Sequence, residues 1–408
     1  MPDQTVRPAE LRREAAAMTE EIIRWRRYLH AHPELSFQEK NSTAFIAETL
    51  RSFGIKNVRT GFADLDVGVL AEIGPPRGPC VLLRADMDAL PVPDQTGLSC
   101  ASTNPGISHA CGHDAHMAIL LATAKLLKAH ENELPGRVRL IFQPAEESSM
   151  PYQGTLRPGA WFVIKDGALD GVGAAFSLHV FGTMKAGTMN IKEGTAMLAS
   201  GFFNAKVTGQ GTHGATPHLG IDPIVPAAAM IGDFQAIIAR EVNPLRSAVL
   251  SICTIHAGTA SNVIPEFCEF SGTLRSEECE LVSYLSDRLQ TVAHKTAEAY
   301  RCNFSYHATL SDAVINEPGV TAIAREAGSA VIGKENVLEA EPLTVSEDFT
   351  LYGQKIPASM FFWGMGDETK GIGQSQHDPT YLVNEETLSD AAAVMVVCAW
   401  KWLKKHSS

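Results

Sequence analysis

The first half of the chain alternates between helical and strand patterns of apolar residues. Apolar residues recur every three or four positions from Pro8 to His30, which predicts an amphipathic helix. Further along, short apolar runs alternate with stretches of helical spacing. We expect strands at Val67–Ile73, Val81–Ala85, Val138–Phe142 and Ala174–Val180, and helices at Asn41–Phe53, Ala115–His130 and Gly159–Asp166. This alternation predicts an α/β fold with a mostly parallel sheet flanked by helices.

The pattern changes after Gly194 and returns near the C-terminus. In between we expect strands at Phe202–Thr208, Leu250–His256, Phe267–Leu274 and Asn303–Ala308, with helices at Pro226–Ile238 and Cys279–Tyr300. The first pattern resumes with helix Val320–Val331, strand Ser359–Trp363 and helix Leu388–Lys404, for which Asn384 is a candidate N-cap. We therefore expect a discontinuous domain (1–195 and 310–408) interrupted by an α+β domain (196–309). A chain of 408 residues exceeds the roughly 250–300 residues that one core supports.

Composition narrows the function class. The formal net charge of -12 argues against nucleic acid as a partner, because binding phosphates needs a basic surface. No apolar run approaches the roughly 18 residues of a membrane span, and no signal-peptide pattern is present. The eight cysteines form no C-x-x-C pair, which excludes a zinc ribbon. We expect a cytoplasmic protein with free thiols and no membrane partner.

The densest group of chemically active residues is the stretch His109-Ala-Cys111-Gly-His113-Asp114-Ala-His116. Cys111 and His113 flank a glycine, whose free backbone allows both side chains to point at one place. A thiolate and an imidazole together suit Zn, and imidazole also binds Mn, Co or Ni. The alternative is a polar helix start with Asp114 as its N-cap. That alternative suits any single histidine better, but the density of the group favours a metal site.

Two adjacent acids, Glu146 and Glu147, follow the strand Val138–Phe142. Side chains alternate in extended structure, so the two carboxylates point in different directions. One can bind a metal while the other takes a proton from water, and hydrolysis needs both a Lewis acid and a general base. A solvated pair of acids in a loop is the ordinary interpretation of this dipeptide alone.

Several further residues indicate a metal or substrate site only when they are considered together. His179 in an apolar strand resembles a buried core histidine, and His377 resembles a turn histidine. In the inserted segment, His213 lies in a glycine-rich loop, and Asn262 and Arg275 are polar. Arginine recognises carboxylates, although a surface ion pair is the ordinary interpretation. A set of five donors is large enough for two metals and leaves Glu146 as a base: Cys111, His113, Glu147, His179 and His377.

With these residues assembled, the chain resembles the zinc-type exopeptidases and amidohydrolases that include aminoacylase, hippurate hydrolase and the hydrolases of indole-3-acetyl-amino-acid conjugates. The most specific part is HACGHD followed by PAEE. The matching stretches run in order along nearly the whole chain: His30–Glu34, Arg84–Pro91, His109–Met117, Phe142–Glu147, Leu178–Val180, Gly211–His218, Asn262–Pro265, Gly272–Arg275, Ser346–Phe349 and His377–Pro379.

The resemblance implies a zinc-exopeptidase-like catalytic domain with an inserted lid domain that forms dimers. It implies that the five donors bind two divalent metal ions, Zn or Mn, with Co or Ni as further candidates. Glu146 would be the general base, and His213 would hold the oxyanion from its own or a neighbouring subunit. Asn262 and Arg275 would hold the substrate carboxylate. Asp88 would orient a metal-bound histidine, whereas Asp86 is not expected to be a ligand.

The predicted activity is hydrolysis of the amide bond of a small N-acyl-amino acid. A metallo-carboxypeptidase or dipeptidase of the same family is the first alternative, and a non-catalytic metal-binding or ligand-binding protein is the second. We expect a homo-oligomer, a dimer or tetramer formed through the lid domain. The segment 148–159 is longer than the glycine-rich link usual in the family, so it can reshape the acyl pocket.

Overall fold

A computed structural model describes residues 7–407 and divides the chain into two compact units. The first unit consists of the chain up to Ala196, Ile315–Glu341 and the chain from Asp348 onward. The second consists of Met197–Val314 and Pro342–Glu347. Residues 1–6 and Ser408, which the expected first domain includes, lie outside the described residues. The catalytic and lid roles of the expected domains stay predictions.

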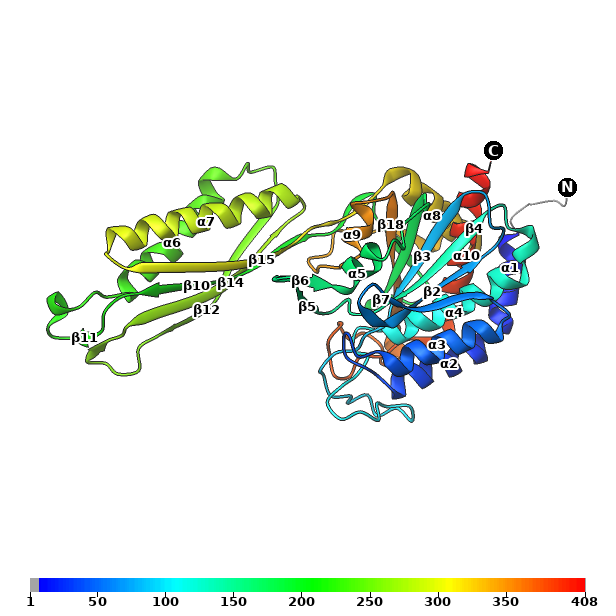
Figure 1. The fold of residues 1–408 in the computed structure, drawn as a ribbon, viewed down its shortest axis with the longest axis horizontal. Coiled ribbons are helices and arrows are strands. Elements are labelled where there is room, and N and C mark those ends of the chain that lie inside the picture. The colour runs from blue at the N-terminus through cyan, green and yellow to red at the C-terminus, as the bar shows by residue number, and fades with distance from the viewer. Residues whose placement is uncertain (1–6, 408) are drawn as a thin grey trace. The chain divides into compact units, whose positions relative to one another are not determined.

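The first unit is built on an eight-stranded sheet with the order β1-β2-β4-β3-β7-β18-β8-β17 (Figure 1). Its strands are β1 (Asn57–Phe62), β2 (Leu65–Ile73), β3 (Cys80–Asp86), β4 (Arg137–Gln143), β7 (Ala174–Lys185), β8 (Met189–Ile191), β17 (Val337–Glu339) and β18 (Ala358–Gly366). The central pairs β4–β3, β3–β7 and β7–β18 are parallel, as is β8–β17. Every residue of β3 is buried, as in a strand covered on both faces. The predicted α/β fold is confirmed.

Helices flank this sheet; some lie between its strands along the chain, and others precede the first strand or follow the last. They are α1 (Pro8–Ala17), α2 (Thr19–Ala31), α3 (Lys40–Ser52), α4 (His113–Ala129), α5 (Gly159–Lys165), α8 (Pro318–Ile332), α9 (Thr350–Gly353) and α10 (Leu388–His406). Single 3-10 turns occur at η1 (Glu131–Glu133), η3 (Lys334–Asn336), η4 (Glu368–Lys370) and η5 (Glu385–Thr387). Helices α4 and α10 pack on β3 and on each other, within one large core. None of the helices within residues 7–407 combines the length and the apolar character that a membrane crossing requires.

Three local expectations were wrong. The predicted helix from Pro8 to His30 is two helices, because the Thr19 hydroxyl donates to Ala16 O (2.8 Å) and competes with the helical pattern at their junction. Asn384 caps η5 rather than α10. The segment 148–159, for which no strand was predicted, contains a hairpin of β5 (Ser149–Tyr152) and β6 (Thr155–Pro158). Its turn residues Gln153 and Gly154 both have positive φ, as a two-residue hairpin turn requires.

The second unit is a four-stranded antiparallel sheet, order β12-β14-β10-β15, with helices packed against it. Its elements are β10 (Ala199–Thr208), β11 (Thr212–His213), η2 (Pro217–Leu219), α6 (Ile224–Glu241), β12 (Ala248–Ala257), β13 (Val263–Ile264), β14 (Phe267–Ser276), α7 (Cys279–Ala299) and β15 (Asn303–Ser311). Alternate residues of β14 are buried, so one sheet face contributes to a core with α6 and α7. Short strands β9 (Gly194–Met197) and β16 (Val314–Asn316) lie where the chain passes between the units.

The central position of β3 makes a stability prediction. Leu83 is 0% exposed in this strand, so Leu83→Ala leaves a cavity and lowers the free energy of unfolding of the first unit by about 2–5 kcal/mol. Leu156→Ala, at a residue 50% exposed on β6, is the matched control and costs below about 1 kcal/mol. Urea unfolding followed by circular dichroism compares the two. Equal losses would contradict the assignment of β3 to the core.

Candidate metal centre

The predicted site residues of the first unit gather at the carboxyl ends of β3 and β4. Strand β3 ends at Asp86, Glu146 and Glu147 follow β4, and α4 begins at His113. Parallel strands end at the same edge of a sheet, which is where ligands bind in such folds. His179 lies within β7, which continues to Lys185 and so extends beyond the predicted end at Val180.

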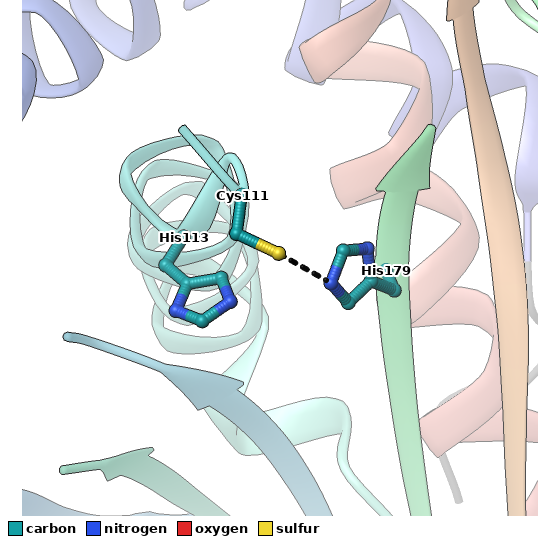
Figure 2. Close-up of side chains that lie close together, drawn as sticks. All are labelled: Cys111, His113 and His179. Carbon is teal, nitrogen blue, oxygen red and sulfur yellow. Dashed lines mark hydrogen bonds between the residues drawn. The ribbon is translucent and has the colours of Figure 1, made fainter. Parts of the chain in front are cut away.

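Cys111 and His113 reach one place because of the glycine between them. Gly112 has φ +85, and a Cβ there would lie 2.5 Å from Val180 Cγ2, so a larger residue does not fit. The Cys111 sulfur lies 3.4 Å from His179 Nε2, and Figure 2 shows both His113 and Cys111 at the helix start, with the sulfur turned toward the His179 ring. A turn and a strand distant in sequence thus bring their donors together.

The five predicted donors form overlapping groups in the structure. Donor atoms of Cys111, His113 and His179 lie within 4.8 Å of one another, and so do those of Cys111, Glu147 and His377. Glu147 Oε1 joins the groups, at 3.3 Å from His377 Nε2 and 3.8 Å from His113 Nε2. A third group places Glu146 with His113 and Glu147. The structure therefore brings together all five donors and Glu146.

The two buried imidazoles are oriented to leave one nitrogen each for a cation. His113 Nδ1 donates to the Asp88 carbonyl (2.9 Å), and His179 Nδ1 donates to the Val180 carbonyl (2.9 Å). A carbonyl only accepts, so each Nδ1 carries a proton, and Nε2 is the ring nitrogen that a cation could bind once it is free of its own proton. His113 Nε2 and Glu147 Oε1 are buried without a hydrogen-bond partner. Buried polar atoms are rarely left unpaired, so these residues fit a divalent cation.

Electrostatics support the same fit. Burial opposes charge on His113, but the carboxylates of Asp86 and Asp88 outweigh it and raise the pKa of His113 to about 10. Burial, with Glu147 and Glu146 adding to it, raises the pKa of the Cys111 thiol well above its usual value. Neighbouring carboxylates raise both pKa values, whereas burial raises the pKa of Cys111 and lowers that of His113. A cation bound there would compensate the charge of these carboxylates and displace these protons.

Asp88 forms hydrogen bonds both with His113 and with the segment that carries Glu146 and Glu147. Besides its carbonyl contact with His113, its carboxylate accepts the backbone N–H groups of Glu146 (3.1 Å) and Glu147 (2.9 Å). Ser36 donates its hydroxyl to the same carboxylate at 2.6 Å. The placement agrees with the orienting role expected for Asp88, which stays a prediction.

The turn before Glu146 is strained and held from two sides. Ala145 has φ +53, a left-handed conformation unusual for a residue with a side chain. Its N–H donates to Glu39 Oε1 (2.8 Å), and its carbonyl accepts from Gly159 N (2.8 Å). Burial raises the pKa of Glu39 to about 8, with the charge of Asp88 adding to it. Sequence reasoning did not find Glu39, because nothing in its local pattern distinguishes it from a surface acid.

Another histidine beside the centre, His116, has both ring nitrogens engaged by other protein groups. His116 Nδ1 contacts Asp86 Oδ1 at 2.6 Å, and His116 Nε2 accepts from Val180 N at 2.9 Å. Asp86 also accepts from Arg84 (2.7 Å), and one of its oxygens lies within 4.8 Å of donor atoms of His113 and His116, so its expected absence from the ligands stays a prediction. These buried contacts were not predicted, since they depend on which strands become neighbours.

The remaining predicted residues belong to the second unit. His213 lies exposed on β11, where its Nδ1 accepts from Ala215 N (3.1 Å). The Asn262 carbonyl accepts from the N–H of Gly214, the residue after His213, at 2.8 Å. His213 and Asn262 therefore lie close together in one small turn region. Arg275, half-buried on β14, donates to Thr344 O (3.1 Å) and stacks 4.7 Å over the Phe202 ring. Their roles toward substrate stay predictions.

Comparison with known proteins gives a consistent result. The sequence profile of Peptidase family M20/M25/M40 matches residues 82–401. N-acetyl-L-cysteine deacetylase of Bacillus subtilis is 37% identical over 394 residues, covering 96% of this chain and 90% of that protein. Thermostable carboxypeptidase 1 of Saccharolobus solfataricus is 35% identical over 399 residues, covering 97% and 99%.

A crystal structure extends the likeness to the fold. The Bacillus subtilis YXEP protein, described as a dinuclear metal-binding peptidase from the M20 family, superposes with a TM-score of 0.80 at 34% identity, covering 95% of this chain and 99% of that one. With the profile match and these relatives, the chain belongs to Peptidase family M20/M25/M40, in the amidohydrolase branch, and is a metal-dependent amidohydrolase.

Proposed function

We propose that the protein hydrolyses the amide bond of N-acyl-amino acids with a centre of two divalent cations. The observation that carries the proposal is the convergence of five donors beside one surplus carboxylate, Glu146. The deacetylase relative, whose name describes removal of an acyl group from an amino acid, supports the substrate class.

Cys111, His113, Glu147, His179 and His377 would hold the cations, Zn or Mn, with Co or Ni as further candidates. When bound, such cations polarise the amide carbonyl and lower the pKa of water toward about 7. His113 and His179 each offer Nε2 because their Nδ1 atoms are engaged by backbone carbonyls.

Glu146 serves as the general base. Its N–H is held by Asp88, and its carboxylate accepts from Asp348 N at 3.3 Å, which orients the group. Glu146 takes a proton from the attacking water and hands it to the departing amine, so one carboxylate acts twice.

His213, Asn262 and Arg275 complete the proposal from the second unit. His213 stabilises the oxyanion, in its own or a neighbouring subunit, and Asn262 and Arg275 hold the substrate carboxylate. A homo-oligomer, dimer or tetramer, forms through this unit. Support comes from β12, an edge strand with Val249 45% exposed and Ile255 52% exposed.

A peptidase is the second candidate, because the carboxypeptidase relative covers nearly the whole chain at 35% identity. Its chemistry at the amide bond would be the same, and only the group on the amine side of the substrate differs. A non-catalytic binding protein has less support, since a binder has no need of Glu146.

A substrate panel tests the proposal. Metal-free and Mn- or Zn-loaded protein is assayed with hippurate, N-acetyl-amino acids and dipeptides. We expect N-acyl-amino acids to be cleaved fastest and only with metal, because the centre supplies the Lewis acid. Faster cleavage of dipeptides would favour the peptidase, and an inert metal-loaded protein would favour the binder.

Replacing the base separates catalysis from metal binding. Glu146→Gln keeps the shape but cannot accept the proton, so kcat falls about a hundredfold or more while bound metal is retained. Glu147→Gln, one residue further on, is expected to lower metal content as well. Rates are measured with an N-acetyl-amino acid, and metal by elemental analysis. Full activity of Glu146→Gln would disprove its role.

The role of Cys111 can be tested against a second buried cysteine. Cys111→Ala removes one donor and is expected to lower the metal bound per chain, as measured by elemental analysis. Cys398→Ala, a 0% exposed cysteine in α10, is the matched control and keeps the wild-type metal content. Equal metal content in both variants would exclude Cys111 as a ligand.

A further inference from the structure

The segment His30–Glu34 contains a buried histidine that the proposed chemistry does not use. His30, near the end of α2, is 1% exposed. Its two ring nitrogens face two carboxylates from distant parts of the chain. Nδ1 lies 2.8 Å from Asp114 Oδ2 and 3.0 Å from Arg26 Nη2. Nε2 lies 3.2 Å from Asp94 Oδ2, within ion-pair distance but without a hydrogen bond. Each of these carboxylates leads to a different part of the metal centre.

The first contact reaches the start of α4. Asp114 follows His113 directly, and its side chain is fully buried. Arg26, one helical turn before His30, places its Nε 2.8 Å from the same Asp114 oxygen. The turn that carries Cys111 and His113 is therefore held on α2 by a buried cation and a buried imidazole.

The second contact reaches the segment that carries His377. Asp94 organises its own loop by accepting N–H groups from Thr96 (2.9 Å) and Ser102 (2.8 Å). The next residue, Gln95, donates its N–H to Pro379 O at 2.8 Å, two residues beyond His377. Asp94 thereby links His30 to the loop that holds His377.

The His377 segment needs such support. His377 has φ +67, a left-handed conformation that is strained for a residue with a side chain. Its N–H donates to Ala110 O at 2.8 Å, next to Cys111. A strained donor on a loop keeps its position only if the surrounding structure holds it, and the Asp94 loop is one part of that structure.

We propose that His30 is a positioning residue that couples the Cys111–His113 turn to the His377 segment, so that their donors share one geometry. The inference rests on the proposed metal centre. His30 acts through Asp114 and Asp94 and does not touch substrate. Partners behind metal ligands typically change metal affinity about 10–100-fold when they are mutated.

The test measures metal affinity directly. Wild type, His30→Asn, His30→Gln and Asp94→Asn are titrated with Zn or Mn against a competing chelator, and Co-loaded forms are compared by visible absorption. We expect the His30 variants to lose about tenfold or more in affinity and to change the Co spectrum. Asp94→Asn, which keeps the shape of Asp94 and removes its charge, is expected to lose affinity mainly for one of two bound ions. Excess metal is expected to restore activity.

His130 provides a matched control, because it also contacts two carboxylates, Glu14 (2.8 Å) and Glu133 (3.1 Å), away from the centre. His130→Asn keeps wild-type metal affinity. Folded His30 variants with wild-type affinity and spectrum would overturn the inference, even if their melting temperature falls. If they do not fold, wild-type behaviour of Asp94→Asn overturns it. A wild-type protein that binds no metal would instead defeat the proposed function, and this inference with it.

Discussion

The candidate metal centre is organised around one buried residue, Asp88, which forms hydrogen bonds with two separate segments of the chain. Its carbonyl fixes the His113 ring, and its carboxylate takes the N–H groups of Glu146 and Glu147. Taking a carboxylate out of water is costly unless such bonds compensate it. Because the same residue engages both segments, neither the imidazole nor the paired acids can move without breaking hydrogen bonds in a dry environment, where broken bonds cost most.

The architecture of the first unit could be predicted because its central strands are unusually regular. Strands β3, β4 and β7 are buried almost throughout, so they appear in the sequence as mostly apolar runs, interrupted by single polar residues such as Arg84, Arg139 and His179. The density of donors around Gly112 was enough to indicate a metal-binding turn from the sequence alone. The break between α1 and α2 was harder to predict, because the apolar spacing continues across it. There the Thr19 hydroxyl donates to the Ala16 carbonyl and competes with the helical hydrogen bonds.

What surrounds the donors could not be predicted, since it depends on which distant segments meet. His116 lies close enough to Cys111 in the sequence to be a candidate ligand, yet its two ring nitrogens contact Asp86 and the backbone N–H of Val180. His30 and Glu39 look like surface residues in their local sequence, and both are buried. Such contacts depend on the order of the strands in the sheet and on long loops, and the local spacing of apolar residues predicts neither of them. The hairpin after Glu147 was missed because its strands are only four residues each.

The close approach of Gly112 to Val180 limits how this centre can change. With no room for even a methyl group, the backbone between Cys111 and His113 admits a single residue type, so the separation of these two side chains is set by main-chain geometry rather than by side-chain choice. Efforts to alter which ion the protein accepts would therefore have more freedom at His377, whose loop is exposed, than at the helix start. The helix start thus provides a fixed frame, and the position of His377 has to conform to it through its bond to Ala110.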